Sequence, residues 1–150
     1  MKKINILSLL RVIFFVYCGG MIWLLFFGNR QPPEYQNYWA QLENHLCPRP
    51  FYTITNYIRA VLTSSSGDIV RHCAVNLLGN VLLFIPGGYL SPKLWQSFRP
   101  FWRFLLIMLG LLLLIESLQL FTLRGIFDVD DVLLNLFGLC IGYLFYMNKK

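Results

Sequence analysis

Carboxylate and amide side chains gather in the last third of the chain, inside and just after a strongly apolar stretch. Glu116 lies within the apolar run 104–121, and four of the chain's seven acidic residues fall between positions 116 and 131. A carboxylate at bilayer depth costs at least about 2.5 kcal/mol, so it usually has a polar partner and a function. Acid–base catalysis or the binding of a polar ligand is the chemistry that this group could perform.

Polar residues at helical spacing accompany Glu116 in the neighbouring apolar runs. At a rise of 1.5 Å per residue, Asn76 and Asn80 lie about 10 and 16 Å inside one run, and Glu116 lies about 8 Å inside another. Residues three or four apart share a helix face. The sequence therefore predicts a ligand-binding polar cluster in the outer half of a membrane. Its candidate residues are Asn76, Asn80, Glu116, Gln119, Arg124, Asp128, Asp131 and Asn135.

A purely structural interpretation exists for most of these residues. An asparagine in a span can serve only as a hydrogen-bond partner between helices. Asp128 or Asp130 is a suitable N-cap for the last apolar run. Arg124 could pair with Asp128 and Asp131 across the short turn. Gly138 and Gly142 are spaced to allow a close approach of two helices.

The composition favours a membrane protein. Hydrophobic residues make up 57% of the 150-residue chain and charged residues only 13%, with a mean hydropathy of +0.56. A soluble domain carries about 25% charged residues. The net charge of +6 is scattered between apolar runs, which does not favour nucleic-acid binding. The sequence contains no phosphate-binding glycine loop and no metal-ligand motif, so no cofactor and no metal are predicted.

Four apolar runs predict an all-α integral membrane bundle in a single domain, 1–150. A bilayer core needs about 20 helical residues, within a range of about 17–25. The first run has a basic start but no cleavage site, and is interpreted as an uncleaved first span. The predicted spans are 4–27, 69–90, 104–121 and 132–147.

The basic residues predict the orientation of these spans. All five lysines lie at the N-terminus, at the C-terminus or at Lys93, between the second and third spans. The positive-inside rule then places both termini in the cytoplasm of a cell, with a multi-pass chain in the plasma membrane. The segment 28–68 becomes a long outer loop, opened by Pro32-Pro33. Apolar spacing in Thr53–Leu62 predicts a short helix there, in the outer interface.

Several smaller features allow more than one interpretation. Cys47 and Cys73 fall on the predicted outer side, where they could form a disulfide, although two free thiols are the simpler interpretation. The Pro86-Gly87-Gly88 segment is interpreted as a kink in, or the end of, the second span. His45 and His72 are interpreted as interfacial residues.

Two segments resemble the VanZ-like membrane proteins. Asn76–Gly88 resembles the N-x-x-x-N-x-x-x-F-x-P-x-G pattern of that family. Glu116–Gly142 is similar to its E-x-x-Q…R…D-x-x-D-x-x-x-N-x-x-G pattern, and Pro50-Phe51 with Thr53-Ile54 matches its approach to the second span. The founding member is linked to low-level resistance to teicoplanin. The resemblance thus implies a bacterial cell-envelope protein with a bearing on antibiotic susceptibility.

Three functions follow as hypotheses. The favoured one is a non-enzymatic protein that binds an outer-leaflet lipid, a cell-wall precursor or an envelope partner. The second is an enzyme acting on a lipid-linked envelope substrate, with Glu116 or Asp131 as general base and Arg124 holding a phosphate or carboxylate. The third is an assembly subunit whose polar stripe lies between helices. No catalytic residue and no oligomeric state is predicted.

Overall fold

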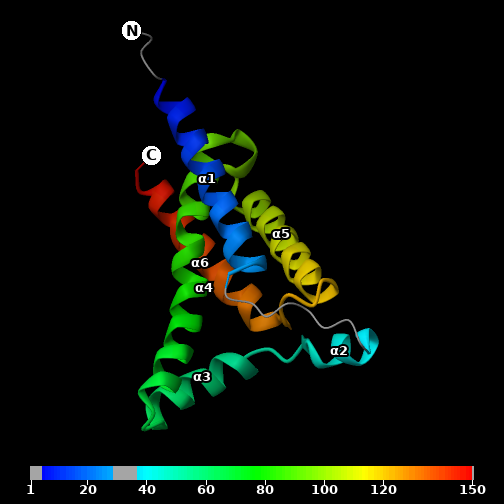
Figure 1. Ribbon diagram of the computed structural model, residues 1–150. Coiled ribbons are helices and arrows are strands. Elements are labelled where there is room, and N and C mark those ends of the chain that lie inside the picture. The colour runs from blue at the N-terminus through cyan, green and yellow to red at the C-terminus, as the bar shows by residue number, and fades with distance from the viewer. Residues whose placement is uncertain (1–4, 29–36, 150) are drawn as a thin grey trace.

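Four long helices dominate the computed structural model, which describes residues 5–28 and 37–149 (Figure 1). They are α1 (Ile6–Phe26), α4 (Gly67–Leu94), α5 (Phe101–Phe121) and α6 (Val129–Met147). Each is long and apolar enough to cross a membrane, which confirms the four predicted spans. Lys2, Lys3, Pro32-Pro33 and Lys150 lie outside the described residues.

The second span differs from its prediction at both ends. α4 runs from Gly67 to Leu94 and contains both Pro86 and Pro92, so of the two interpretations of Pro86-Gly87-Gly88, a kink or the end of the span, the second is wrong. A proline removes one hydrogen bond from a helix interior, but tertiary packing can outweigh that loss. Here the segment after Pro86 is among the most buried parts of α4, because it packs against α6.

The packing of α4 against α6 is the most extensive interface in the bundle. Glycines make it possible. A Cβ atom built on Gly138 would lie 2.1 Å from the carbonyl oxygen of Val81, and one on Gly142 would lie 2.1 Å from that of Ile85. From the α4 side, a Cβ atom on Gly88 would lie 2.0 Å from the carbonyl oxygen of Leu139. The close approach predicted for Gly138 and Gly142 is therefore confirmed.

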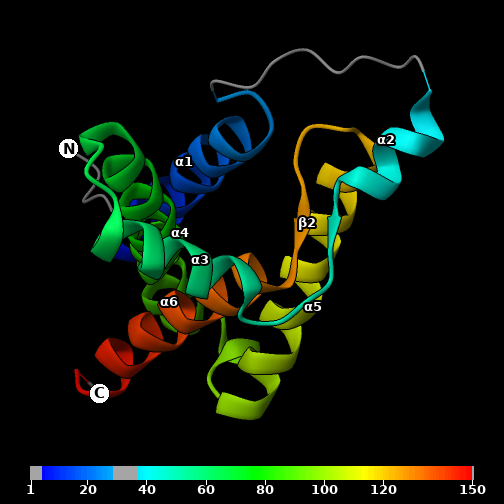
Figure 2. The same ribbon diagram turned by 90° about the horizontal axis from the view of Figure 1, so that it is seen from below.

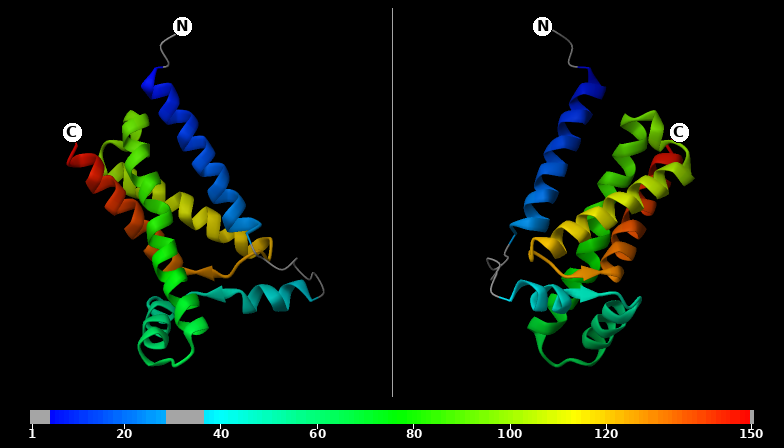
Figure 3. Two further views of the ribbon diagram at one scale, coloured as in Figure 1. Left: turned by 60° about the vertical axis from the view of Figure 1, so that its left-hand side comes forward. Right: turned by 90° about the vertical axis from the view of Figure 1, so that its right-hand side faces the viewer.

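The other two spans flank this pair unequally. α5 packs on α6, with Phe104 completely buried and Leu112 nearly so. α1 lies at the side of the bundle (Figure 3), and Met21 is its single buried residue. The hydroxyl of Tyr17 donates a 2.7 Å hydrogen bond to the carbonyl of Leu83 and fixes α1 to α4. The first span is thus the least enclosed of the four.

The segment between α1 and α4 carries structure of its own. It contains α2 (Tyr38–Asn44), the two-residue strand β1 (Leu46–Cys47) and α3 (Tyr52–Thr63). α3 matches the helix predicted at Thr53–Leu62, and it crosses one end of the bundle (Figure 2). β1 pairs in parallel with β2 (Phe127–Asp128) just before α6, so the fold is not all helical. This pairing brings the start of α3 to the start of α6.

The two ends of the bundle differ in charge. The start of α1, the end of α6 and the α4–α5 connection lie at one end, and α3 lies at the other (Figure 1). The connection carries Arg99, and Lys93 precedes it in the last turn of α4. This grouping agrees with the distribution of basic residues from which the orientation was predicted. That this end faces the cytoplasm stays a prediction.

Cys47 and Cys73 are free thiols, as are Cys18 and Cys140.

Candidate functional site

Asp130 fixes α3 across the end of the bundle. Its carboxylate is fully buried and accepts hydrogen bonds from the backbone N–H groups of Phe51, at 2.5 Å, and Ile54, at 3.0 Å. Phe51 is the N-cap of α3, with φ at 63°, and its own side chain cannot cap the helix. Asp130 therefore supplies, from a distant part of the chain, the acceptor that a capping residue normally provides.

Asp128 accepts hydrogen bonds from both α6 and α3. It is the N-cap of α6, where its Oδ1 accepts a 2.9 Å hydrogen bond from the Asp130 N–H, as the sequence predicted. Its Oδ2 accepts a 2.6 Å hydrogen bond from the hydroxyl of Thr53. The sequence analysis missed the role of Asp130. The signal available in the sequence was the Phe-x-Thr-Ile segment at 51–54. In the structure, Asp128 and Asp130 accept hydrogen bonds from this segment.

Gln119 and Arg124 hold the C-terminal end of α1. Gln119 Nε2 donates to the carbonyl of Leu25 at 2.9 Å, and Arg124 Nη1 donates to that of Phe26 at 3.0 Å. The guanidinium also stands over the ring of Phe27, 4.8 Å from its centroid. The last carbonyls of a helix lack partners within the helix and attract cations. These contacts therefore fix the position of the C-terminal end of α1.

In the part of the chain that the structure describes, Arg124 does not form the pairing with Asp128 and Asp131 that the sequence allowed. Within it, the guanidinium makes its contacts with Phe26 and Phe27. The physical reason is that a helix C-terminus with unfilled acceptors competes for the cation, whereas Asp128 already has backbone and hydroxyl donors.

Seven of the eight candidate residues line one cavity of about 480 Å³, which we name the polar cavity. It lies beneath α3, between α4, α5 and α6. Arg124 is the candidate residue that does not line it. The seven are Asn76, Asn80, Glu116, Gln119, Asp128, Asp131 and Asn135. Counting the depth of polar residues along each span therefore grouped residues that line one cavity in the structure.

Hydrogen bonds fix part of this lining. Asn80 Nδ2 donates to Asp131 Oδ1 at 2.5 Å and so joins α4 to α6. Asn76 donates to the carbonyl of His72 in its own helix, at 2.9 Å. Glu116 is 3% exposed, and its Oε2 lies 3.5 Å from the N–H of Asp128.

Asn135 differs from these residues. Its side chain is 3% exposed, and its Oδ1 has no hydrogen-bond partner among the residues that the structure describes. A buried polar atom without a partner costs about 1–3 kcal/mol, which invites a donor from outside the chain.

Three further polar side chains on the described cavity wall were not among the candidates: Thr53, Tyr57 and His72. Burial raises the pKa of the Tyr57 hydroxyl, and the charge of Asp131 adds to the effect. His72 was interpreted only as an interfacial residue, yet it faces this cavity beside Asn76. Thr53 and Tyr57 reach the cavity because Asp128 and Asp130 hold α3 in place, a contact between distant segments that periodicity does not reveal.

The charges of the polar cavity define what it can bind. Its lining includes the carboxylic acids Glu116, Asp128 and Asp131, and among the described residues neither lysine nor arginine occurs in it. Among the residues that the structure describes, no group of three His, Cys, Asp or Glu side chains could hold a metal ion. The cavity is thus suited to a ligand that donates hydrogen bonds or carries positive charge.

Comparison with known proteins gives one match. A family model described as VanZ/LLP1 matches residues 14–150, which include α1 from Phe14 on, the three later spans and every described residue of the polar cavity. No curated protein matches the chain, and no solved structure does.

Proposed function

The chain belongs to the VanZ/LLP1 family, and we propose that it binds the polar headgroup of an outer-leaflet amphiphile in the polar cavity. The observation that carries the proposal is the convergence of α3, α4, α5 and α6 on one cavity whose lining includes three carboxylic acids beside amide and hydroxyl groups. Polar groups among membrane spans are costly to bury and are usually paired or functional. A bound headgroup would donate a hydrogen bond to the buried Asn135 Oδ1, which has no hydrogen-bond partner among the described residues.

The acceptors indicate the class of headgroup. The polar cavity offers carboxylates at Glu116 and Asp131 and the unfilled amide oxygen of Asn135. A primary ammonium donates three hydrogen bonds and complements negative charge. Among the described residues of this wall, no arginine or lysine would meet a phosphate or carboxylate group. An amine-bearing headgroup therefore fits better than an anionic one.

The position of Arg124 bears on the second hypothesis. An enzyme that uses Arg124 to hold a phosphate needs the guanidinium at the cavity, whereas Arg124 caps α1. Binding without catalysis is therefore the function we propose. The structural hypothesis has the Asn80–Asp131 hydrogen bond in its favour. Lipid binding by Glu116→Gln and Asp131→Asn distinguishes the structural hypothesis from ligand binding.

We place the polar cavity on the outer side of the plasma membrane, with both termini in the cytoplasm, following the positive-inside rule. On this basis the protein would act on the envelope from within the membrane. An effect on teicoplanin susceptibility is part of the proposal, and it follows from the family resemblance alone.

The direct test is binding of phosphatidylethanolamine to the detergent-purified protein, measured by native mass spectrometry. We expect the wild type to prefer it to phosphatidylglycerol, which has a phosphate but no amine. Glu116→Gln and Asp131→Asn should each weaken binding by about tenfold or more, since a hydrogen bond to a charged group contributes about 1.5–3 kcal/mol.

Glu43→Gln is the matched control, because Glu43 is exposed on α2 and does not line the cavity. It should bind as the wild type does. If Glu116→Gln and Asp131→Asn keep full lipid binding and only lower the amount of protein in the membrane, the polar residues are structural and the proposal is wrong.

A further inference from the structure

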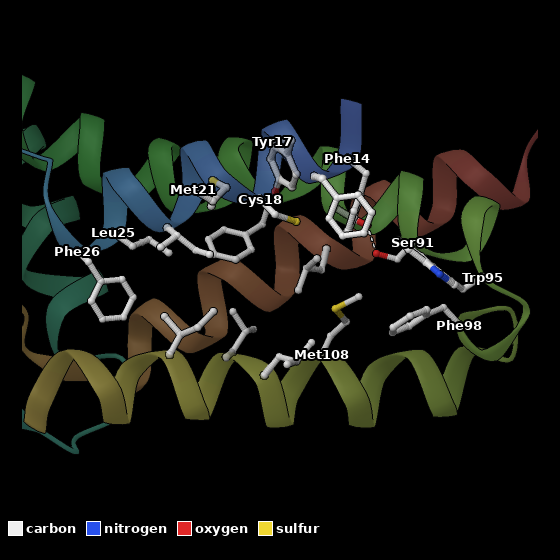
Figure 4. A pocket seen from close by; sticks show the side chains of 18 residues that line it. Phe14, Tyr17, Cys18, Met21, Leu25, Phe26, Ser91, Trp95, Phe98 and Met108 are labelled. Atoms are coloured by element: carbon white, nitrogen blue, oxygen red, sulfur yellow. Dashed lines mark hydrogen bonds between the residues drawn. The ribbon is translucent and has the colours of Figure 1, made fainter. Parts of the chain in front are cut away.

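A second cavity of about 480 Å³ lies along the inner face of α1. We name it the apolar cavity. α1 forms one wall and α5 the opposite one, with α4 and α6 behind them (Figure 4). Phe14, Cys18 and Met21 reach into it from α1, and Met108 reaches into it from α5.

The hydroxyl groups on its wall are already satisfied. Tyr17 donates to the carbonyl of Leu83 at 2.7 Å, and Ser91 donates to that of Gly87 at 2.7 Å. The rest of the lining is almost entirely hydrocarbon, with the thiol of Cys18 among it. Such a wall matches an occupant that needs no hydrogen bonds.

The apolar cavity adjoins the polar cavity. Leu25 of α1 and Phe84 of α4 line both of them. From this junction the apolar cavity follows α1 from Phe26 back to Phe14, twelve residues or about 18 Å of helix. One leaflet of a bilayer has a hydrocarbon depth of about 15 Å, half of the core. The apolar cavity thus has the length of one leaflet and begins where the polar cavity ends.

We propose that the apolar cavity holds a hydrocarbon chain of the same amphiphile whose headgroup occupies the polar cavity. The inference rests on the proposed function and extends it to the lipid tail. In a bilayer, moving a chain from lipid into an apolar cavity brings little hydrophobic gain. The hydrocarbon chain must nevertheless stay in an apolar environment when the headgroup of the lipid enters the protein. The adjoining apolar cavity provides that environment.

The apolar cavity has the size of a small-molecule site. Its volume is about 480 Å³, within the range of about 300–1,000 Å³ that is usual for such sites. A single hydrocarbon chain is an occupant of that kind.

The weak enclosure of α1 provides a route of entry. Only 6% of its most apolar stretch is buried, compared with 33% for α5. Its polar anchors are Tyr17 near the middle and the Leu25 and Phe26 carbonyls at the end. A lipid can therefore reach both cavities sideways from the bilayer, between α1 and α5.

Filling the apolar cavity tests this proposal. Cys18→Trp places an indole in the cavity, and Cys140→Trp is the matched control, because Cys140 is an equally half-buried thiol in α6 that lines neither cavity. The probe is phosphatidylethanolamine with two sixteen-carbon chains, and bound lipid is counted by native mass spectrometry. Cys18→Trp should lower occupancy at least tenfold, and Cys140→Trp should leave it unchanged.

A second measurement locates the chain directly and does not depend on Cys18. With Trp23, Trp39 and Trp102 replaced by phenylalanine, the fluorescence comes from Trp95 on the cavity wall. Phosphatidylethanolamine with brominated chains should quench Trp95 at one lipid per protein, and Glu116→Gln should remove this quenching at the same concentration.

The outcomes separate the two proposals. If Glu116→Gln weakens binding while Cys18→Trp does not, and Trp95 is unquenched, the headgroup site stands and the chain site is wrong. If Cys18→Trp alone weakens binding, the chain site stands without the proposed headgroup site. If neither variant changes lipid binding, both proposals fail.

Discussion

Gly138→Ala lowers the free energy of unfolding by about 1–3 kcal/mol or more, a large effect for the addition of one methyl group. The added Cβ would lie 2.1 Å from the carbonyl oxygen of Val81, a backbone atom that cannot rotate away. α4 and α6 would have to separate, and the contacts at Gly142 and Gly88 would loosen with them. The measurement is thermal unfolding of the purified protein in detergent, followed by circular dichroism.

Gly110→Ala is the control for this experiment. Gly110 lies in α5, and a Cβ atom there would meet nothing within 4 Å. Replacing glycine by alanine in an open helical position stabilises a helix by about 0.5–1 kcal/mol. Gly110→Ala should therefore unfold at the wild-type temperature or slightly above it. Equal unfolding temperatures for Gly138→Ala and wild type would contradict the close packing of α4 and α6.

Asp130→Ala releases α3 from the end of the bundle. It removes the acceptor of two backbone N–H groups, those of Phe51 and Ile54, in a fully buried place. Hydrogen bonds to a charged group contribute about 1.5–3 kcal/mol, so amide exchange at the start of α3 should accelerate roughly 100-fold. Hydrogen exchange with mass spectrometry on peptides that cover residues 51–57 measures the change.

Asp68→Ala is the comparison for the loss of a carboxylate near a helix start, because Asp68 is exposed in the first turn of α4. It should leave exchange at 51–57 as in the wild type. The long spans should also keep their protection in Asp130→Ala, since local opening does not require global unfolding. Unchanged exchange at residues 51–54 in Asp130→Ala would show that α3 is held by other contacts.

The spans and the polar cavity could be predicted because both depend on local rules. Hydropathy over about 20 residues identifies a span, and a fixed rise per residue places Asn80 and Glu116 at comparable depth. Polar groups at one depth in adjacent spans then meet if the spans pack side by side. This reasoning identified seven residues that the structure brings to one cavity.

The errors concern partners that are distant in the chain. Arg124 was paired with the nearest acidic residues, whereas the carbonyl it meets, that of Phe26, lies 98 residues earlier. Asp130 binds the start of α3, 76 and 79 residues away. α4 continues through Pro86 because α6 packs against it, and hydropathy carries no information on that contact. Spacing within one helix cannot reveal these pairings.

Gly79→Leu gives the most direct test of the polar cavity as a binding site. Gly79 lines that cavity, and a Cβ atom there meets nothing within 4 Å, so we expect a leucine to extend into the cavity. Gly110→Leu adds the same side chain to α5 outside both cavities. Both variants should fold, because each removes a glycine from a helix interior. We predict that Gly79→Leu loses phosphatidylethanolamine in native mass spectrometry while Gly110→Leu retains it; equal lipid binding by the two folded variants would contradict the account.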